Sequence, residues 1–254
     1  MRALILSDIH GNLEALNAVL DAAAALPGAF DELWNLGDVV GYGGSPNQVI
    51  DRLRPIATVN VRGNHDRVCA GATSSLGFNP IARAAALWTN QELTPENLLW
   101  LNELPQGPLY PAHPDVCCVH GSPLNEDQYI LNMRDAWAPL QQMPTAITFF
   151  GHTHVQGGFA QQEHEWHEIR PQYRNRREPE SWTLPLPPGT RHLINPGSVG
   201  QPRDADWRAA FAICDEDAHA ITYHRVPYDL TASQGRILMA GLPERLAARL
   251  REGR

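Results

Sequence analysis

Side chains that can bind metal ions occur in five short clusters, and each cluster directly follows a run of apolar residues. The clusters are Asp8-Ile9-His10-Gly11-Asn12, Gly37-Asp38, Gly63-Asn64-His65-Asp66, His120-Gly121 and Gly151-His152-Thr153-His154. Carboxylate and imidazole groups together suit first-row ions such as Mn²⁺, iron or Zn²⁺. These groups are too many for one ion, whereas two ions about 3.5–4 Å apart that share a carboxylate would use them and leave positions for water and a phosphate oxygen.

Each cluster alone has an ordinary structural explanation. Gly37-Asp38 is a common turn sequence, and His152 and His154 fit hydrogen-bonded core histidines equally well. All five clusters nevertheless follow apolar runs, and this joint pattern is far more specific than any single motif. It therefore favours a metal site over a set of unrelated turns.

The apolar runs before the clusters are predicted to be buried β-strands, at residues 3–6, 32–36, 56–61, 116–119 and 147–150. Helical patterns alternate with them, over 13–25 and 46–53 and after the start signals Asn79-Pro80 and Thr94-Pro95. This alternation predicts a layered α/β fold. In open α/β sheets the carboxyl ends of the strands converge on the binding crevice, so the clusters are expected to meet at one edge. The glycines beside the ligands are expected to take positive φ and turn the backbone sharply.

The second half of the chain has a different texture. Shorter strand candidates near 156–162, 191–194, 209–214 and 219–226 indicate antiparallel β-structure. The proline-rich segment 171–189 is predicted to be a long irregular loop, and the tail over 230–251 to be helical with a break at Gly241-Leu242-Pro243. With no linker or repeat visible, residues 1–254 are predicted to form a single domain.

Composition limits the possible partners and the location. The net charge of −8 argues against broad binding of duplex nucleic acid, which needs a basic face. It leaves a small phosphorylated substrate open, because bound divalent cations would reverse the local field. The amino terminus does not resemble a signal peptide, and no apolar run reaches the length of a membrane span. We therefore expect a cytoplasmic protein with no membrane contact. Its four cysteines are expected to pack in the core as free thiols. The sequence leaves its oligomeric state open.

The order of these clusters along residues 8–154 resembles the motif pattern of the calcineurin-like metallophosphoesterase superfamily. The resemblance implies an αββα sandwich, in which two packed mixed β-sheets are flanked by helices. It also implies a dinuclear metal centre. One ion would be bound by Asp8, His10 and His154, the other by Asn64, His120 and His152, with Asp38 bridging the two. Two divalent ions are therefore the expected cofactors, with Mn²⁺ favoured and iron, Zn²⁺, Ni²⁺ or Mg²⁺ as alternatives.

Longer matches narrow this resemblance to a bacterial and archaeal phosphodiesterase-like branch. They are Asp-Ile-His-Gly-Asn at 8–12, Gly-Asp-Val-Val-Gly-Tyr-Gly at 37–43 and Asn-Pro-Gly-Ser-Val-Gly-Gln-Pro-Arg at 195–203. The diadenosine-polyphosphate hydrolase and protein phosphatase branches usually have Arg-Gly-Asn-His-Glu and an Arg soon after Gly-Asp. This chain has Asp66 and Gly41-Tyr42-Gly43 at those places.

The expected function is metal-dependent hydrolysis of phosphate esters, with phosphodiesters favoured and cyclic or small nucleotides among the possible substrates. A phosphomonoesterase or a protein phosphatase would use the same site. A non-catalytic scaffold with this fold is the alternative from another class, and the complete set of ligand residues disfavours it.

His65 and Asp66 are the candidate catalytic residues beside the ligands. In the family, the residue that matches His65 lies near the leaving group, which implies a general acid. Asp66 is expected to accept a hydrogen bond from His65 or from a backbone amide and to hold the loop. Substrate contacts are predicted at four positions that also fit ordinary turns or surface sites: Asn12, Arg62, Ser198 and Arg203.

Overall fold

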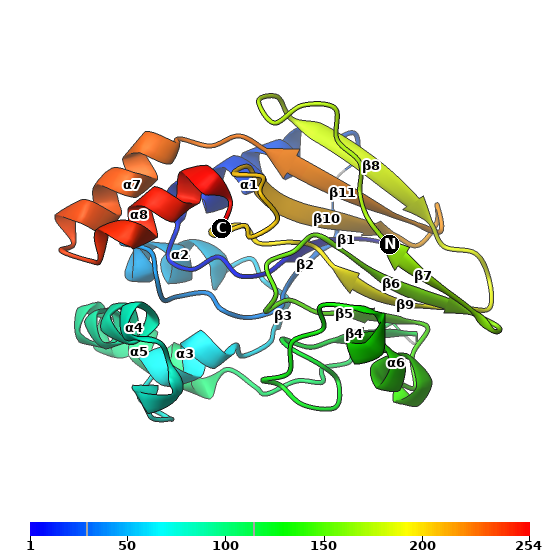
Figure 1. Cartoon of the computed structure of the whole chain (residues 1–254), viewed down its shortest axis with the longest axis horizontal. Helices are drawn as coiled ribbons and strands as arrows, with labels where there is room; N and C mark the ends of the chain where they lie inside the picture. The colour runs from blue at the N-terminus through cyan, green and yellow to red at the C-terminus, as the bar shows by residue number, and fades with distance from the viewer. Residues whose placement is uncertain (29, 114) are drawn as a thin grey trace.

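Two mixed β-sheets pack face to face in the computed structural model, which describes residues 1–28, 30–113 and 115–254 (Figure 1). The first sheet contains β1 (Arg2–Leu6), β2 (Glu32–Asn35), β3 (Val59–Asn60), β8 (Glu180–Pro185), β10 (Ala209–Asp215) and β11 (Ala220–Val226). Their spatial order is β3-β2-β1-β10-β11-β8. Strands β1, β2 and β3 run parallel, whereas β10 lies antiparallel to β1.

The second sheet is built from β4 (Val116–Cys118), β5 (Ile147–Phe149), β6 (Gly157–Gln162), β7 (Glu165–Ile169) and β9 (Thr190–Asn195). Its order is β4-β5-β9-β6-β7, with β4, β5 and β9 parallel and β6 antiparallel to both of its neighbours. Both sheets are therefore mixed, as the sequence predicts.

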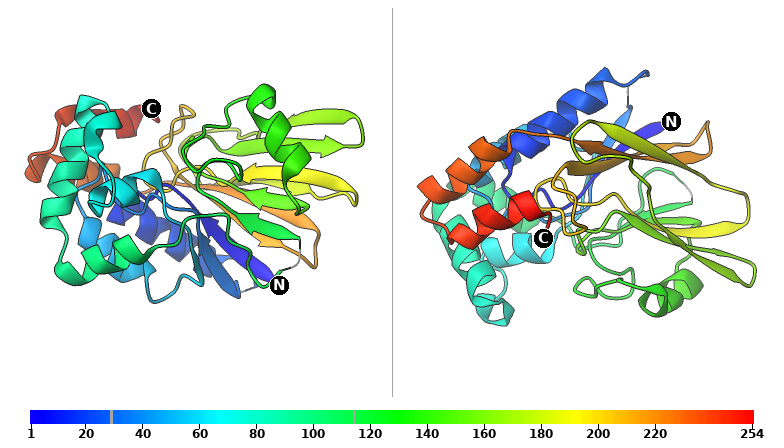
Figure 2. Two further views of the ribbon diagram at one scale, coloured as in Figure 1. Left: turned by 90° about the horizontal axis from the view of Figure 1, so that it is seen from below. Right: turned by 45° about the horizontal axis from the view of Figure 1, so that its top comes forward.

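Helices cover the outer faces of the two sheets (Figures 1 and 2). They are α1 (Leu13–Ala25), α2 (Pro46–Leu53), α3 (Asn64–Cys69), α4 (Pro80–Glu92), α5 (Pro95–Glu103), α6 (Met133–Gln142), α7 (Leu230–Met239) and α8 (Glu244–Glu252), with a 3₁₀ turn at Ser75–Gly77. Alternation along β1 explains the layers: Leu4 and Leu6 pack with residues of α1 and α2, whereas Ala3 and Ile5 pack between the sheets. On the far side, α6 packs against the second sheet.

Residues 171–189 differ from the predicted irregular loop, because β8 occupies 180–185. Trp182 and Leu184 are half-buried against the core between the sheets, while Ser181 and Thr183, which alternate with them, are exposed. This alternation with period two is typical of a strand with one buried face. β8 pairs only with β11 among the described strands, and prolines are tolerated on such an edge strand. The proline content was therefore a misleading signal.

Two expectations about the rest of the chain can be checked directly. The four cysteines, Cys69, Cys117, Cys118 and Cys214, are buried free thiols, as predicted. Within the described ranges, no helix combines the length and the apolar character that crossing a membrane requires.

Candidate metal centre

The predicted ligand residues lie where strands end, at one edge of the sandwich. Asp8 and His10 follow β1, Asp38 follows β2, and Asn64 opens α3 just after β3. His120 follows β4, and His152 and His154 follow β5. The parallel pairings of β1 with β2 and of β4 with β5 bring these strand ends together.

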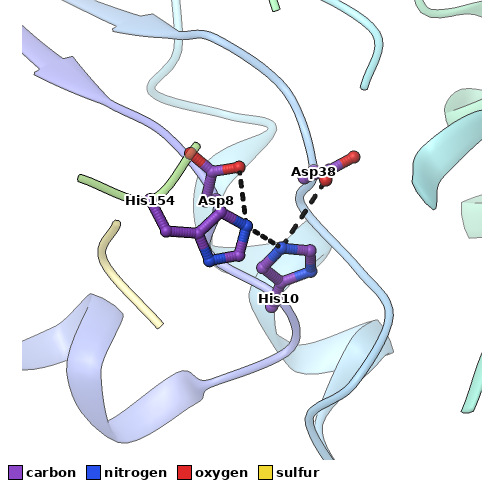
Figure 3. Close-up of side chains that lie close together, drawn as sticks. All are labelled: Asp8, His10, Asp38 and His154. Atoms are coloured by element: carbon purple, nitrogen blue, oxygen red, sulfur yellow. Dashed lines mark hydrogen bonds and ion pairs between the residues drawn. The ribbon is translucent and has the colours of Figure 1, made fainter. Parts of the chain in front are cut away.

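One group of ligands consists of Asp8, His10, Asp38 and His154 (Figure 3). The Nε2 atoms of His10 and His154 are 3.2 Å apart. Asp8 Oδ1 lies 3.3 Å from Nε2 of His154, and Asp38 Oδ2 lies 3.5 Å from Nε2 of His10. All four residues are buried. The group therefore presents oxygen and nitrogen atoms to one small volume.

A second group shares the same aspartate. Nε2 of His120 lies 3.5 Å from Asp38 Oδ2, 3.1 Å from Asn64 Oδ1 and 3.1 Å from His152 Nδ1. Asp38 thus belongs to both groups of candidate ligands. This is the arrangement that two metal ions with a common carboxylate require.

Backbone carbonyls fix the tautomer of three of the histidines. Nδ1 of His10, His120 and His154 donates to a carbonyl oxygen, over 3.0, 2.9 and 2.6 Å respectively. Since Nδ1 carries the hydrogen, the lone pair of Nε2 faces the other ligands, as it does in histidines that bind metal. Lone pairs only 3.2 Å apart repel each other unless a positive charge lies between them. The donor set therefore fits divalent cations.

His152 has the opposite orientation. Its Nδ1 faces the centre, while its buried Nε2 has no hydrogen-bond partner among the described residues. The ring stacks on Tyr129, with the centroids 3.8 Å apart and the planes at 26°. Tyr129 thus holds this ligand ring by stacking rather than by a hydrogen bond.

The charges at the centre also indicate a place for a cation. Burial lowers the pKa of His10 and His154, and it lowers the pKa of His152 to about 3, so these rings are neutral near pH 7. Burial opposes a charge on His120 as well, but Asp38 outweighs it and raises the pKa of His120 to about 9. Without a metal, a proton on His120 supplies the positive charge that Asp38 requires.

The ligand residues themselves adopt left-handed backbone conformations. Asp8, His10, Asp38, His152 and His154 have φ between 48° and 66°. Such conformations cost of order 1 kcal/mol or more for residues with a Cβ, and they concentrate at functional sites. Among the neighbouring glycines, Gly11 and Gly37 take positive φ as expected, and the ligands themselves also carry much of the sharp turning.

Gly63 is needed for a different reason, because Asp38 approaches its Cα closely. A Cβ at this position would overlap the carboxylate and the backbone nitrogen of Asp38. We expect Gly63→Ala to displace Asp38 and to lower the metal content of the purified protein, as measured by elemental analysis. The matched control is Gly235→Ala in α7, where a Cβ meets no atom of the described chain within 4 Å. Unchanged metal content in Gly63→Ala would contradict this role.

Asp66 holds the loop through backbone amides, which is one of the two alternatives that the sequence left open for it. Its buried carboxylate accepts hydrogen bonds from the backbone N–H groups of Asp38, Val40 and Gly63, over 2.8, 3.2 and 3.0 Å. No hydrogen bond joins it to the His65 ring within the described chain. Asp66 therefore fixes the two loops that carry Asp38 and Asn64 relative to each other.

His65 lies beside the ligands without belonging to either ligand group. Its backbone N–H donates to Asp38 Oδ1 over 2.8 Å. Its ring packs between Tyr42 and Phe78, with centroid distances of 4.3 and 4.5 Å. Nδ1 is buried and finds no hydrogen-bond partner in the described part of the chain. Burial lowers the pKa of His65 to about 4, so the free side chain is neutral near pH 7.

Three of the four predicted substrate contacts make hydrogen bonds or ion pairs within the chain. Asn12 caps α1 by accepting from Ala15 N–H and donates to the Gly200 carbonyl. The Ser198 hydroxyl donates to the carbonyl oxygen of Asp8 over 2.7 Å. Both side chains are buried and committed to the scaffold. Arg62 pairs at 3.3 Å with Glu126, which also pairs with Arg67.

Arg203 is the predicted substrate contact that the structure places beside the metal centre. Its guanidinium lies 5.8 Å from the centre of the Tyr42 ring, and its backbone N–H donates to the carbonyl of His154. Tyr42 itself lies 4.7 Å from the His10 ring. Arg249 in α8 reaches the same Tyr42 ring at 6.0 Å. Sequence reasoning missed Arg249, because no local spacing relates a residue in a helical tail to the strand-end clusters.

The chain belongs to the calcineurin-like phosphoesterase superfamily, whose domain model matches residues 1–219. Its sequence is similar to an uncharacterized protein of Methanocaldococcus jannaschii, with 33% identity over 98% of this chain and 97% of that protein. Its structure is similar to a crystal structure of a metallophosphoesterase from Sphaerobacter thermophilus. That similarity has a TM-score of 0.83 and 40% identity, over 100% of this chain and 99% of the other.

A hypothetical protein from Pyrococcus horikoshii has the same fold. The TM-score is 0.78 at 21% identity, and the similarity covers 100% of this chain and 98% of that one. The family and these similarities agree with the αββα sandwich predicted from the sequence, and they identify the chain as a member of a phosphoesterase family with a candidate metal site.

Proposed function

We propose that this protein is a dinuclear metal-dependent hydrolase that cleaves phosphodiesters in preference to phosphomonoesters. The single observation that carries the dinuclear part is the place of Asp38 in both groups of candidate ligands. Asp8, His10 and His154 would hold one ion, and Asn64, His120 and His152 the other. Mn²⁺ is the favoured ion because the set mixes carboxylate and amide oxygen with imidazole nitrogen.

When bound, two such ions would neutralise charge on the phosphate and lower the pKa of a water molecule. The chain's own contribution is to orient the ligands and to serve the leaving group. His65 fits this second role, because it adjoins Asp38 without being a ligand. Its buried Nδ1 has no acceptor among the described residues, which favours the tautomer with hydrogen on Nε2. The bound phosphate's negative charge would favour the imidazolium, whose Nε2 proton would pass to the leaving oxygen and leave the neutral ring.

The preference for diesters is supported by the loop after Asp38. The Gly41-Tyr42-Gly43 loop lacks the arginine that the phosphatase branches place soon after Gly-Asp, and such an arginine would pair with a dianionic phosphate. A cavity of about 510 Å³ also adjoins Tyr42, which offers space for a second substituent on phosphorus. Monoester hydrolysis is the second candidate, since Arg203 near Tyr42 provides one cation from another direction.

The test is kcat/KM for matched aryl phosphate monoester and diester substrates in Mn²⁺ at one pH. We expect the diester to be hydrolysed about tenfold more efficiently, which corresponds to about 1.4 kcal/mol of transition-state stabilisation. A tenfold preference for the monoester would overturn the diesterase proposal and leave the two-metal proposal standing. Hydrolysis of neither substrate in any divalent metal would contradict both.

A further inference from the structure

A cavity of about 510 Å³ lies between the metal centre and the carboxyl-terminal helix. Tyr42, the start of α4 and the arginines of α8 and the following residues line it. Tyr42 also contacts the rings of His10 and His65, so this one side chain separates the cavity from the candidate active site. α7 and α8 follow the region that the family model matches (Figure 2). The match ends before β11, so the helix pair and this strand of the first sheet both lie outside the matched region.

The cavity is strongly cationic. Arg245, Arg249 and Arg254 line it, and none of the lining residues in the described chain is an aspartate or glutamate. Glu252 lies 4.0 Å from Arg254, which partly offsets that one arginine. Burial lowers the pKa of Arg249, and the guanidinium of Arg203 lowers it further. Arg203 and Arg245 thus place positive charge beside Arg249. Tyr42 and Glu252 offset this charge in part, and an anionic ligand would offset it further.

Arg249 is half-buried and held by the scaffold, whereas Arg245 and Arg254 are exposed at the rim of the cavity. Nε of Arg249 donates to the backbone carbonyl of Arg254. The carbonyl of Gly253 accepts from Ala205 N–H over 2.9 Å, which ties the end of α8 to the loop after Arg203. On its other side, α8 packs through Leu246 and Leu250 into a core that includes Tyr42. Fixed guanidinium groups lose less freedom on binding, which favours a specific anion site.

The position of the cavity relative to His65 indicates which part of the substrate it meets. Tyr42 and Phe78 both pack on the His65 ring, and the residues after Phe78 line the cavity. His65 is the group proposed to face the leaving oxygen. A substituent that extends from the leaving oxygen past His65 would therefore enter the cavity.

We propose that Arg245 and Arg249, which line the cavity, form a subsite that binds a second phosphate carried by the leaving group of a small phosphodiester. Arg203 adds positive charge from beside the Tyr42 ring, which it shares with Arg249. The subsite rests on the proposed function, because the scissile phosphate is taken to lie at the metal centre. Arginine suits this task, since its planar donors pair with phosphate oxygens in two hydrogen bonds.

The experiment compares kcat/KM for a dinucleoside monophosphate with kcat/KM for the same molecule carrying a terminal phosphate at one end. The phosphate can be attached at either of the two ends, which gives two orientations to test. For the wild-type holoenzyme, we expect about tenfold more efficient cleavage of the phosphorylated molecule in at least one of them. Arg249→Ala is expected to bring the ratio close to one, and Arg249→Glu to bring it below one. The matched control is Arg251→Ala, an exposed arginine of the same helix, which is expected to keep the wild-type ratio.

A wild-type ratio near one in both orientations would overturn the subsite. An equal loss in Arg251→Ala would also overturn it, because the effect would then come from overall charge. A second measurement is independent of turnover: calorimetric binding of a nucleoside 3′,5′-bisphosphate to the holoprotein. Arg249→Glu is expected to weaken this binding about tenfold or more, and an equal Kd would overturn the subsite. If neither dinucleotide is cleaved, the diesterase proposal fails, while the calorimetry still decides on the subsite.

Discussion

Asp38→Ala is expected to remove both metal ions and to lower kcat/KM by more than about 10³-fold. The reason is geometric, because Asp38 Oδ2 lies 3.5 Å from Nε2 of His10 in one ligand group and 3.5 Å from Nε2 of His120 in the other. Without this carboxylate, the first group keeps only the carboxylate of Asp8, and the second keeps no carboxylate to balance the charge of a divalent cation. Elemental analysis of the purified variant and an aryl diester assay measure the two effects.

Asn64→Ala is the matched control for the bridging role. The Asn64 amide oxygen lies 3.1 Å from Nε2 of His120 and would serve the second ion alone. We therefore expect this variant to lose mainly one ion per chain, whereas Asp38→Ala loses two. Full loading with two ions in Asp38→Ala would contradict the shared carboxylate, even if activity fell.

His65→Ala is expected to keep its metals and to lower kcat on alkyl esters by about 10²–10⁴-fold, the usual contribution of a general acid. Metal binding should survive, because the contact with Asp38 Oδ1 comes from the backbone N–H of residue 65, which alanine retains. Aryl esters have good leaving groups and need less protonation, so their rate should fall less. The measurement is kcat for a series of diesters with leaving groups of increasing pKa.

The steepness of that series separates two roles for His65. If kcat of the variant depends more steeply on leaving-group pKa than kcat of the wild type does, proton donation from Nε2 is supported. Equal losses across the series would show that His65 positions Tyr42 and Phe78, which pack on its ring, and that protonation comes from elsewhere. Loss of metal in His65→Ala would contradict both roles.

The sequence was most informative where a buried strand ends in a polar cluster. The apolar run before Asp8 and the one before Asp38 form neighbouring parallel strands, so that strand order alone brings these carboxylates together. The same reasoning placed His120 and His152 at the ends of β4 and β5. Such predictions succeed because apolar periodicity decides where strands lie, and parallel strands place their carboxyl ends at one edge.

Features that depend on packing between distant segments were not predictable in this way. Arg249 reaches Tyr42 only because α8 folds back over the first half of the chain. Asn12 and Ser198 had the residue types of substrate contacts, but their hydrogen bonds to Gly200 and Asp8 connect segments about 190 residues apart. No local pattern distinguishes a polar side chain that supports a ligand loop from one that faces the substrate.

The most direct test of the shared carboxylate is anomalous diffraction from crystals of the wild-type protein grown with Mn²⁺. The two-metal arrangement predicts two anomalous peaks about 3.5–4 Å apart, with the Asp38 carboxylate between them. One peak should lie among Asp8, His10 and His154, and the other among Asn64, His120 and His152. A single peak at full occupancy, or two peaks of which one has no contact with Asp38, would contradict the dinuclear centre.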